Sequence, residues 1–402
     1  MLATTGQMKA FTSLANPEYE NPPFVAFQSV TTGTRLENLN LNWRERDLPE
    51  RERTKHVHRM HPYLGKYIPQ LVEIFLRKFK PRSVYDPFCG SGTTLVEANA
   101  LGIESIGCDI SAFNCLVTNA KVRKYDTTLA SREIRAALAE LESSFSGTLF
   151  SKARPIETEN EYLRAWFSPE ALRALLLYRE LIDQFHHRDL MKVILSRAAR
   201  SARLTTHHNL DFPRKPQTEP YQCRKHDRTC SPTTDAFQFI RRYSLDTIER
   251  IEAFSRIRTD APASVIWGDA QSVKLPKFDM IMTSPPYVGL IDYHDQHRYA
   301  YELLGLPRRE DNEIGAAFKG KSAKAHEEYM SGIKKVLENA RRHLRPRGVA
   351  VIVVGDREGL YKDTLAGELN FRVLDRLSRH VNRRTGRRNS DFFESVLIWE
   401  AT

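Results

Sequence analysis

Apolar residues follow two different periods along this chain. Short continuous apolar runs, which predict buried strands, occupy residues 83–85, 105–109, 264–269, 278–282, 349–354 and 394–399. Helices are predicted within 61–79 and over 95–100, 132–145, 244–257 and 326–344. Ser168 followed by Pro169 is typical of a helix start, because it places a capping hydroxyl before a proline in the first turn.

The order of these elements predicts the fold class. Residues 83–109 read as strand, glycine turn, helix and strand, which is a βαβ unit and implies a parallel sheet. Between 126 and 260 the chain is helical and basic, and within it 205–234 has no period and predicts an irregular loop or lobe. We therefore expect an extension over 1–55 and an α/β domain formed by 56–125 and 261–402. An insert over 126–260 divides that domain.

Composition narrows the class of protein. The 402 residues are 41% hydrophobic and carry a net charge of +11, which favours a polyanionic partner such as nucleic acid. Five cysteines without framework spacing favour a reducing compartment. No signal peptide is evident and no apolar run reaches the roughly 18 residues that span a bilayer. A cytoplasmic protein without a membrane partner is expected.

The turn after the first strand has the features of a nucleoside site. Gly90 and Gly92 allow close approach of a ligand, and Asp109 ends the next strand, where a carboxylate can bind ribose hydroxyls. No lysine follows the last glycine, so the turn differs from a phosphate-binding loop. A tight turn with incidental glycines is the alternative explanation.

A second motif, Thr283-Ser284-Pro285-Pro286-Tyr287, ends the apolar strand at 278–282. Two prolines cannot continue a central strand, so the residues after it project from its carboxyl end, where open α/β sheets bind ligands. A hydroxyl, rigid carbonyls and an aromatic face at this point can hold a flat polar ring.

These two motifs together resemble those of the S-adenosylmethionine-dependent DNA amino-methyltransferases. The turn reads Asp86-Pro87-Phe88-Cys89-Gly90-Ser91-Gly92-Thr93, and serine at the first position of the tetrapeptide resembles the cytosine-N4 branch. The adenine-N6 branch usually has Asp or Asn there. The resemblance implies a Rossmann-like seven-stranded methyltransferase sheet flanked by helices. The insert would then form much of a helical and irregular target-recognition lobe.

The resemblance also assigns roles to individual residues. It implies S-adenosylmethionine as cofactor, held by Tyr63, Lys66, Asp86, Phe88, Gly90, Gly92, Thr93, Asp109 and Asp269. It implies a catalytic tetrapeptide of Ser284, Pro285, Pro286 and Tyr287, in which the Ser284 hydroxyl and the Pro285 carbonyl accept the hydrogens of the cytosine amine. The cytosine would be flipped out of duplex DNA. No covalent enzyme–base bond is needed, so Cys89 is not expected to be a nucleophile.

Basic residues outside these motifs are candidates for DNA contact. The cluster before the last strand comprises Arg379, Arg383, Arg384, Arg387 and Arg388. In the insert, the candidates are Arg197, Arg200, Arg203, Arg214 and Lys215, any of which could instead belong to a solvated face. Expected partners are double-stranded DNA and a candidate cognate restriction endonuclease.

Cysteine and histidine gather in the irregular part of the insert. Cys223, His226 and Cys230, with His207 and His208 nearby, could supply four zinc ligands, but their spacing fits no standard zinc finger. The sequence therefore favours ordinary packing or loop polarity over a metal or a disulfide, and no metal site is predicted.

Taken together, the sequence favours a site-specific cytosine-N4 DNA methyltransferase. Three alternatives remain open: an adenine-N6 DNA methyltransferase, an RNA guanine-N2 methyltransferase, and a DNA-binding protein that keeps the fold without catalysis.

Overall fold

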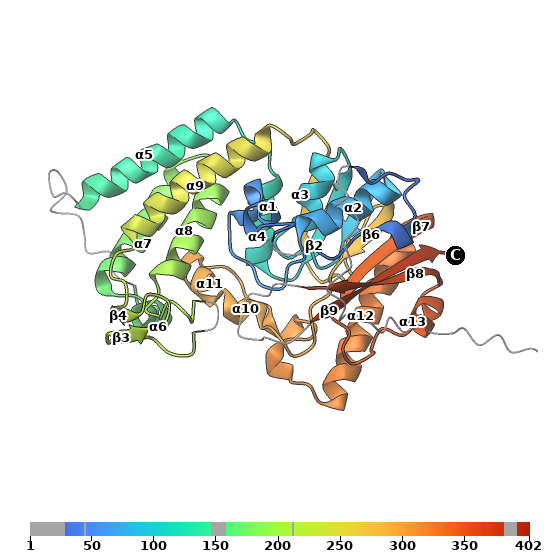
Figure 1. The fold of residues 1–402 in the computed structure, drawn as a ribbon. Coiled ribbons are helices and arrows are strands. Elements are labelled where there is room, and N and C mark those ends of the chain that lie inside the picture. Colours follow the sequence, from blue (N-terminus) through green and yellow to red (C-terminus); the bar gives the residue numbers. More distant parts are fainter. Residues whose placement is uncertain (1–28, 44–45, 146–157, 211–212, 382–391) are drawn as a thin grey trace, which may run out of the picture.

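Seven strands form one central sheet with the spatial order β5-β2-β1-β6-β7-β9-β8 (Figure 1). The computed structural model describes residues 29–43, 46–145, 158–210, 213–381 and 392–402. The strands are β1 (Ser83–Asp86), β2 (Glu104–Asp109), β5 (Ala263–Trp267), β6 (Phe278–Thr283), β7 (Leu344–Val354), β8 (Phe371–His380) and β9 (Phe393–Ala401). In this sheet β9 runs opposite to the other six strands, which are parallel to one another. The predicted Rossmann-like seven-stranded methyltransferase sheet is confirmed.

Strand alternation determines which helices cover which face of the sheet. In β6, Met280 and Met282 join the apolar core beneath α2 (Pro69–Phe79). Ile281, between them, joins the core beneath α12 (Ala323–His343) on the opposite face. Because successive side chains of a strand point to opposite faces, one apolar run supplies both cores.

The segment before the first long helix belongs to the same domain as the sheet. Val30, Leu41 and Trp43 are at most 7% exposed and pack in the core on the α2 side. Part of the predicted extension over 1–55 is thus integral to the sheet domain, while 1–28 lies outside the described residues.

A helical lobe lies at one end of the sheet (Figure 1). Its long helices are α5 (Thr127–Phe145), α7 (Pro169–Leu181), α8 (Arg188–Ala202) and α9 (Phe237–Ser255). Their core is continuous with α4 (Ala112–Val122), which packs on β5 and β2 at that end of the sheet. The predicted cap is confirmed, because the Ser168 hydroxyl accepts the Ala171 N–H at 3.2 Å.

The lobe also contains elements that the sequence did not predict. Helix α8 went undetected, and the stretch expected to be irregular holds an antiparallel hairpin of β3 (Tyr221–Cys223) and β4 (Arg228–Cys230).

The other helices are short. They are α1 (Glu50–Arg53), α3 (Thr93–Ala100), α6 (Glu161–Trp166), α10 (Tyr293–Gln296), α11 (Arg298–Leu304) and α13 (Asp363–Glu368), with 3₁₀ turns at Leu36–Asn38, His56–Arg59, Ile182–Gln184, Glu310–Asn312 and Ala317–Lys319. Within the part of the chain that the structure describes, no helix is long and apolar enough to cross a membrane.

Candidate functional site

A cavity opens at the carboxyl ends of β1, β2, β5 and β6. This is the edge where the strand order reverses between β1 and β6, which is the usual ligand site of an open α/β sheet. Nine of the residues predicted from sequence line it: Tyr63, Lys66, Phe88, Gly90, Thr93, Asp109, Asp269, Ser284 and Pro286. Both sequence motifs therefore meet at one cavity. Asp86, Gly92, Pro285 and Tyr287 are not among its lining residues.

The two glycines of the turn have different structural roles. Gly90 has a φ of +49°, and a Cβ built on it would lie 3.0 Å from the Tyr63 hydroxyl, so glycine lets that ring reach the turn. Gly92 has a φ of +79° and begins α3, where a Cβ would lie 2.5 Å from the Thr118 side chain of α4. Gly90 thus shapes the cavity, whereas Gly92 permits close packing of α3 against α4.

Asp86 lies directly behind the cavity wall and is fully buried. Its carboxylate accepts the hydroxyl of Thr94 at 2.6 Å, the hydroxyl of Thr283 at 2.7 Å and the Phe88 N–H at 3.2 Å. Burial raises the pKa of Asp86, and these hydrogen bonds oppose the rise. Asp86 therefore joins β1, α3 and β6, and positions the turn without lining the cavity.

Asp109 points into the cavity from the end of β2. One carboxylate oxygen accepts the Gly90 N–H at 2.8 Å, and the other accepts the Ser111 N–H at 2.8 Å and the Asn114 amide at 3.1 Å. Burial raises the pKa of Asp109 to about 6 despite these bonds. Because a carboxylate has about four acceptor positions, the oxygen bonded to Gly90 can take one further donor.

Tyr63 and Lys66 also line the cavity, and Tyr63 lies beside Asp109 because both contact the Asn114 amide. The Tyr63 hydroxyl accepts the Asn114 amide at 3.1 Å, and the ring stacks on Tyr293 with centroids 5.7 Å apart. The Lys66 ammonium donates to the His58 carbonyl at 3.0 Å, and burial lowers its pKa to about 8. Burial also raises the pKa of Cys89 well above its usual range, so this cavity residue stays a thiol.

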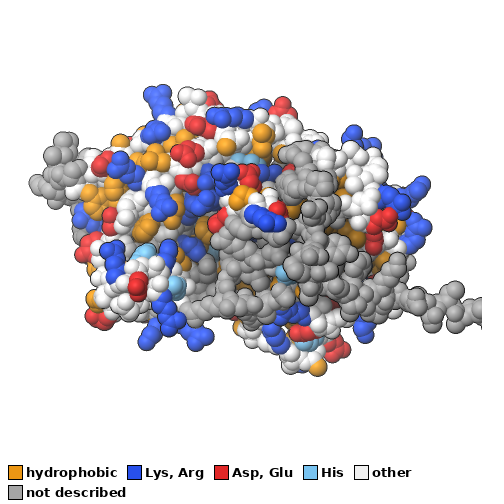
Figure 2. Space-filling view, viewed as in Figure 1, with side chains coloured by type: hydrophobic (Ala, Val, Ile, Leu, Met, Phe, Trp, Pro, Cys, Tyr) orange, Lys and Arg blue, Asp and Glu red, His pale blue; other side chains and the backbone are white. Residues whose placement is uncertain are grey.

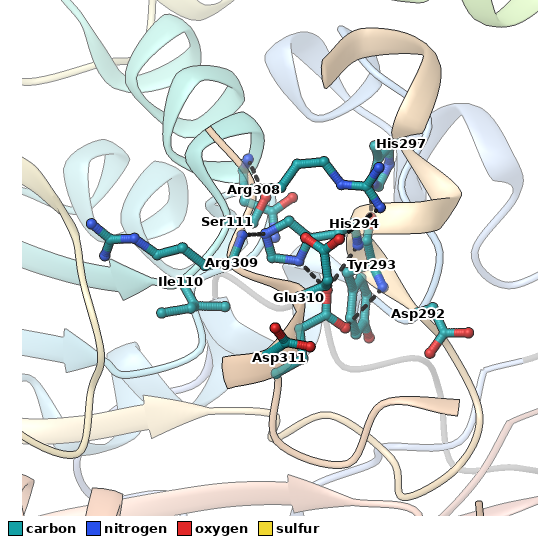
Figure 3. A network of polar contacts seen from close by, with 12 residues as sticks. Ile110, Ser111, Asp292, Tyr293, His294, His297, Arg308, Arg309, Glu310 and Asp311 are labelled. Carbon is teal, nitrogen blue, oxygen red and sulfur yellow. Dashed lines mark hydrogen bonds and ion pairs between the residues drawn. The ribbon is translucent and has the colours of Figure 1, made fainter. Parts of the chain in front are cut away.

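The segment after β6 supplies further cavity residues, which could not be identified from sequence (Figure 3). Glu313 lines it and accepts the backbone N–H groups of Tyr293 at 3.1 Å and His294 at 2.8 Å. The His294 ring also bonds to Glu313 through Nδ1, and its Nε2 accepts the Arg309 N–H at 3.2 Å. His294 must therefore carry its proton on Nδ1. No local pattern links positions 294 and 313, so only the folded chain reveals this wall.

A buried polar chain leads away from Ser284. The Tyr287 hydroxyl, which neighbours Ser284, donates to Glu394 at 2.9 Å, and Glu394 accepts Arg379 at 2.8 Å. Burial and the Glu394 carboxylate raise the pKa of Tyr287 well above its usual range. Tyr287 is thus a neutral hydroxyl held behind the cavity.

Arg379 was predicted to contact DNA, but the structure places it inside the protein. It is 7% exposed, pairs with Glu394 and lies over the ring of Trp43. A guanidinium held in this way does not face DNA phosphates. The other four members of that cluster, Arg383, Arg384, Arg387 and Arg388, lie outside the described residues.

Two arginines of the insert are likewise engaged inside the protein. Arg197 pairs with Asp246 and lies over the ring of Tyr243, and Arg203 lies 4.5 Å from the centre of the Tyr299 ring. Arg214 and Lys215, by contrast, are exposed.

Comparison with known proteins gives a consistent result. A family profile described as DNA methylase (N6_N4_Mtase) matches residues 39–119 and 278–397. Type II methyltransferase M.MjaII of Methanocaldococcus jannaschii is 37% identical over 87% of this chain and 81% of its own length. Type II methyltransferase M.MvaI of Kocuria varians is 27% identical over 58% of this chain and 53% of its own length.

Among solved structures, the rRNA methyltransferase aviRa of Streptomyces viridochromogenes matches 85% of this chain and 88% of its own, with 13% identity. Its TM-score of 0.32 is too low to support an inference about either chain.

Proposed function

This chain belongs to the N6/N4 family of DNA methylases, and we propose that it methylates the N4 amine of cytosine in duplex DNA. It is a type II DNA methyltransferase that uses S-adenosylmethionine. The choice of cytosine over adenine rests on Ser284, which stands where adenine enzymes usually carry Asp or Asn. The family match favours DNA over RNA as substrate and a catalyst over a non-catalytic binding protein.

The cavity suits this cofactor in its donor and acceptor set. Asp109 can accept one ribose hydroxyl. Phe88 and Asp269 line the same cavity, where the Phe88 ring can contact an adenine ring and Asp269 can accept its amine. The Asp269 carboxylate is held by the Gln271 N–H at 2.9 Å. When bound, S-adenosylmethionine supplies a methyl group on positively charged sulfur.

The polar chain behind Ser284 supports its role as an acceptor. Because the Tyr287 hydrogen is donated to Glu394, the Tyr287 oxygen is the proposed acceptor for the hydrogen of the neighbouring Ser284 hydroxyl. The lone pairs of Ser284 are then left for a hydrogen of the cytosine amine. Arg379 donates to Glu394 and holds it in place, so it acts as a positioning residue.

The backbone carbonyls of Pro285 and Pro286 have different roles. The Pro286 carbonyl accepts the Tyr329 hydroxyl at 2.9 Å, which fixes the turn. This leaves the Pro285 carbonyl as the proposed second acceptor for the amine. Two acceptors on one amine favour a pyramidal nitrogen with a usable lone pair, and correct alignment supplies much of the remaining acceleration.

Product analysis is the direct test. Purified protein is incubated with duplex DNA and S-adenosylmethionine carrying a deuterated methyl group, and the nucleosides are then separated and identified by mass spectrometry. We expect labelled N4-methylcytosine; labelled N6-methyladenine alone would transfer the assignment to adenine.

A variant tests the polar chain separately. Tyr287→Phe removes the acceptor for the Ser284 hydrogen, so kcat should fall about 10-fold or more while the cofactor Kd is retained, since one hydrogen bond to a reacting group is worth about 1.5 kcal/mol. Tyr125→Phe is the matched control, because that hydroxyl donates only to the Ala120 carbonyl, at 2.9 Å. Equal losses in both variants would contradict the positioning role.

We infer further that residues 126–260 form the target-recognition lobe and that a restriction endonuclease of the same specificity accompanies the enzyme. Exposed Arg214 and Lys215 support a DNA-facing surface on this lobe. Resistance of DNA methylated by the protein to a candidate endonuclease, with cleavage of unmethylated DNA, tests the pairing.

A further inference from the structure

Four metal-ligating side chains converge in the loop between α8 and α9. They are His207, Cys223, His226 and Cys230, and one ligand atom from each lies within 4.8 Å of the others. Cys223 ends β3, Cys230 ends β4, and His226 lies in the turn between the strands. His207 comes from the loop after α8, so the four side chains bring the hairpin together with that loop.

The distances match the edges of a tetrahedral zinc site. The Cys223 sulfur lies 3.4 Å from Nδ1 of His207 and 3.8 Å from Nδ1 of His226, and the Cys230 sulfur lies 3.4 Å from Nδ1 of His226. A tetrahedron with usual Zn–S and Zn–N bond lengths has S···N edges of about 3.6 Å. Two sulfurs and two nitrogens in this arrangement are typical of Zn²⁺.

We propose that His207, Cys223, His226 and Cys230 bind one structural Zn²⁺ ion. Four protein ligands complete the coordination shell and leave no open position for a reacting water, which distinguishes structural from catalytic zinc. This reverses the expectation from sequence, where the irregular spacing argued against a metal.

The hairpin needs such a link because it has almost no core of its own. Of residues 221–230, only Cys223 and Cys230 are buried, at 0% and 9% exposure. An isolated two-stranded hairpin is marginal in water, and small units without an apolar core usually depend on a disulfide or a metal. A metal between the two cysteines would take the place of the missing core.

Hydrogen bonds around the sulfurs also suit bound thiolates. The backbone N–H groups of Lys225 and His226 face the Cys223 sulfur. Donors of this kind stabilise metal-bound sulfur. The Tyr221 hydroxyl lies 2.9 Å from Nδ1 of His207 and also accepts the His207 N–H at 3.1 Å, so it can remain bonded when that nitrogen turns to a metal.

The zinc site would fix a basic surface. Exposed residues of the hairpin include Arg224, Lys225 and Arg228. In Figure 2, Lys and Arg side chains surround histidines at the end of the molecule that carries this hairpin. The metal thus orders a positively charged projection of the lobe.

Metal analysis of the full-length protein, purified without chelators, tests the proposal. Mass spectrometry of elements should find about one zinc ion per chain, and all five cysteines should titrate as free thiols after denaturation. A chain that holds no zinc and takes up none from a chromogenic zinc indicator would overturn the proposal. So would a disulfide between Cys223 and Cys230, which would remove two titratable thiols.

A pair of variants locates the ion. Cys223→Ser should reduce bound zinc from about one ion per chain to near zero, whereas His208→Ala should keep it, because His208 is exposed in the same loop but outside the cluster. Replacement by Co²⁺ should give thiolate-to-cobalt charge-transfer absorption in the wild type and in His208→Ala. Full zinc in Cys223→Ser, or loss in His208→Ala, would contradict the assignment. Zinc content is measured without methyl transfer, so its outcome is separate from that of the catalytic proposal.

Discussion

The proposed contact between Asp109 and a ribose hydroxyl predicts that cofactor binding depends on pH in an unusual range. Burial places the pKa of Asp109 at about 6. Binding favours the ionised carboxylate, because a charged acceptor makes the stronger hydrogen bond. As pH falls through 6, a growing fraction of Asp109 is protonated, so cofactor binding becomes coupled to the unfavourable deprotonation of this carboxyl group. With a pKa of about 6, the Kd for S-adenosylmethionine should rise about 10-fold between pH 7 and pH 5.

Replacement of Asp109 by Asn should weaken binding and abolish this dependence. An amide can satisfy the Gly90 N–H or the Ser111 and Asn114 donors, but in either orientation its own NH₂ faces a donor. Loss of the charged acceptor costs about 1.5–3 kcal/mol, so the Kd at pH 7 should rise roughly 10- to 150-fold.

Calorimetric titration at pH 5, 6, 7 and 8 measures both effects. The amino and carboxyl groups of the cofactor titrate mainly outside the range between pH 5 and 7. Asp269→Asn is the matched control, because it changes another carboxylate of the same cavity and should keep the pH dependence. A wild-type Kd that changes less than twofold between pH 7 and 5, or a persistent slope in Asp109→Asn, would refute the reasoning.

Three further predictions concern catalysis and stability. Ser284→Ala should lower kcat about 10- to 100-fold with little change in cofactor Kd, measured by steady-state kinetics and calorimetry; equal losses would count against its catalytic role. Gly92→Ala should lower the urea midpoint more than Gly102→Ala, since both have positive φ but only Gly92 faces a side chain within 4 Å; similar midpoints would contradict this. Trp43→Ala should cost about 3–5 kcal/mol of unfolding free energy, because the ring is 7% exposed; a loss below 1 kcal/mol would show that 29–43 is not integral to the domain.

The ends of the strands could be predicted from sequence because their signals are local. Glycines, prolines and a terminal acid each restrict the backbone within a few residues, and parallel strands bring their carboxyl ends to one edge. Gly90, Asp109 and Ser284 therefore meet at the cavity as expected. The wall formed by Tyr293 and Glu313 could not be predicted in this way, since it depends on a long connection without a period.

Whether a charged side chain is buried or exposed also could not be predicted from the sequence. Arg379 belongs to a basic run, and in sequence such a residue looks the same whether it is solvated or buried. Its partner Glu394 lies directly opposite in the pairing of β8 with β9. That pairing could not be foreseen while β8 itself went undetected, so a buried ion pair was read as a DNA contact.

The cysteine and histidine cluster shows the same limit. The sequence argued against a metal because the compact spacing of Cys223, His226 and Cys230 fits no standard zinc finger, and His207 stands 16 residues before Cys223. The hairpin places Cys223 and Cys230 near each other and His226 between them, and only the return of the loop after α8 adds the fourth ligand. Ligand spacing is thus informative for compact zinc motifs, and fails where one ligand comes from a separate loop.

The polar chain behind Ser284 bears on the base that the enzyme accepts. The Tyr287 hydroxyl has one hydrogen, and it is donated to Glu394. Its oxygen can accept a hydrogen bond, and the hydroxyl of neighbouring Ser284 is the proposed donor. An ionised aspartate there would place two carboxylates around a single hydroxyl hydrogen, at the cost of an unpaired buried charge. The surroundings thus disfavour the acidic form of the adenine-type motif and retain a hydroxyl whose lone pairs face the base, which is the arrangement that the cytosine assignment requires.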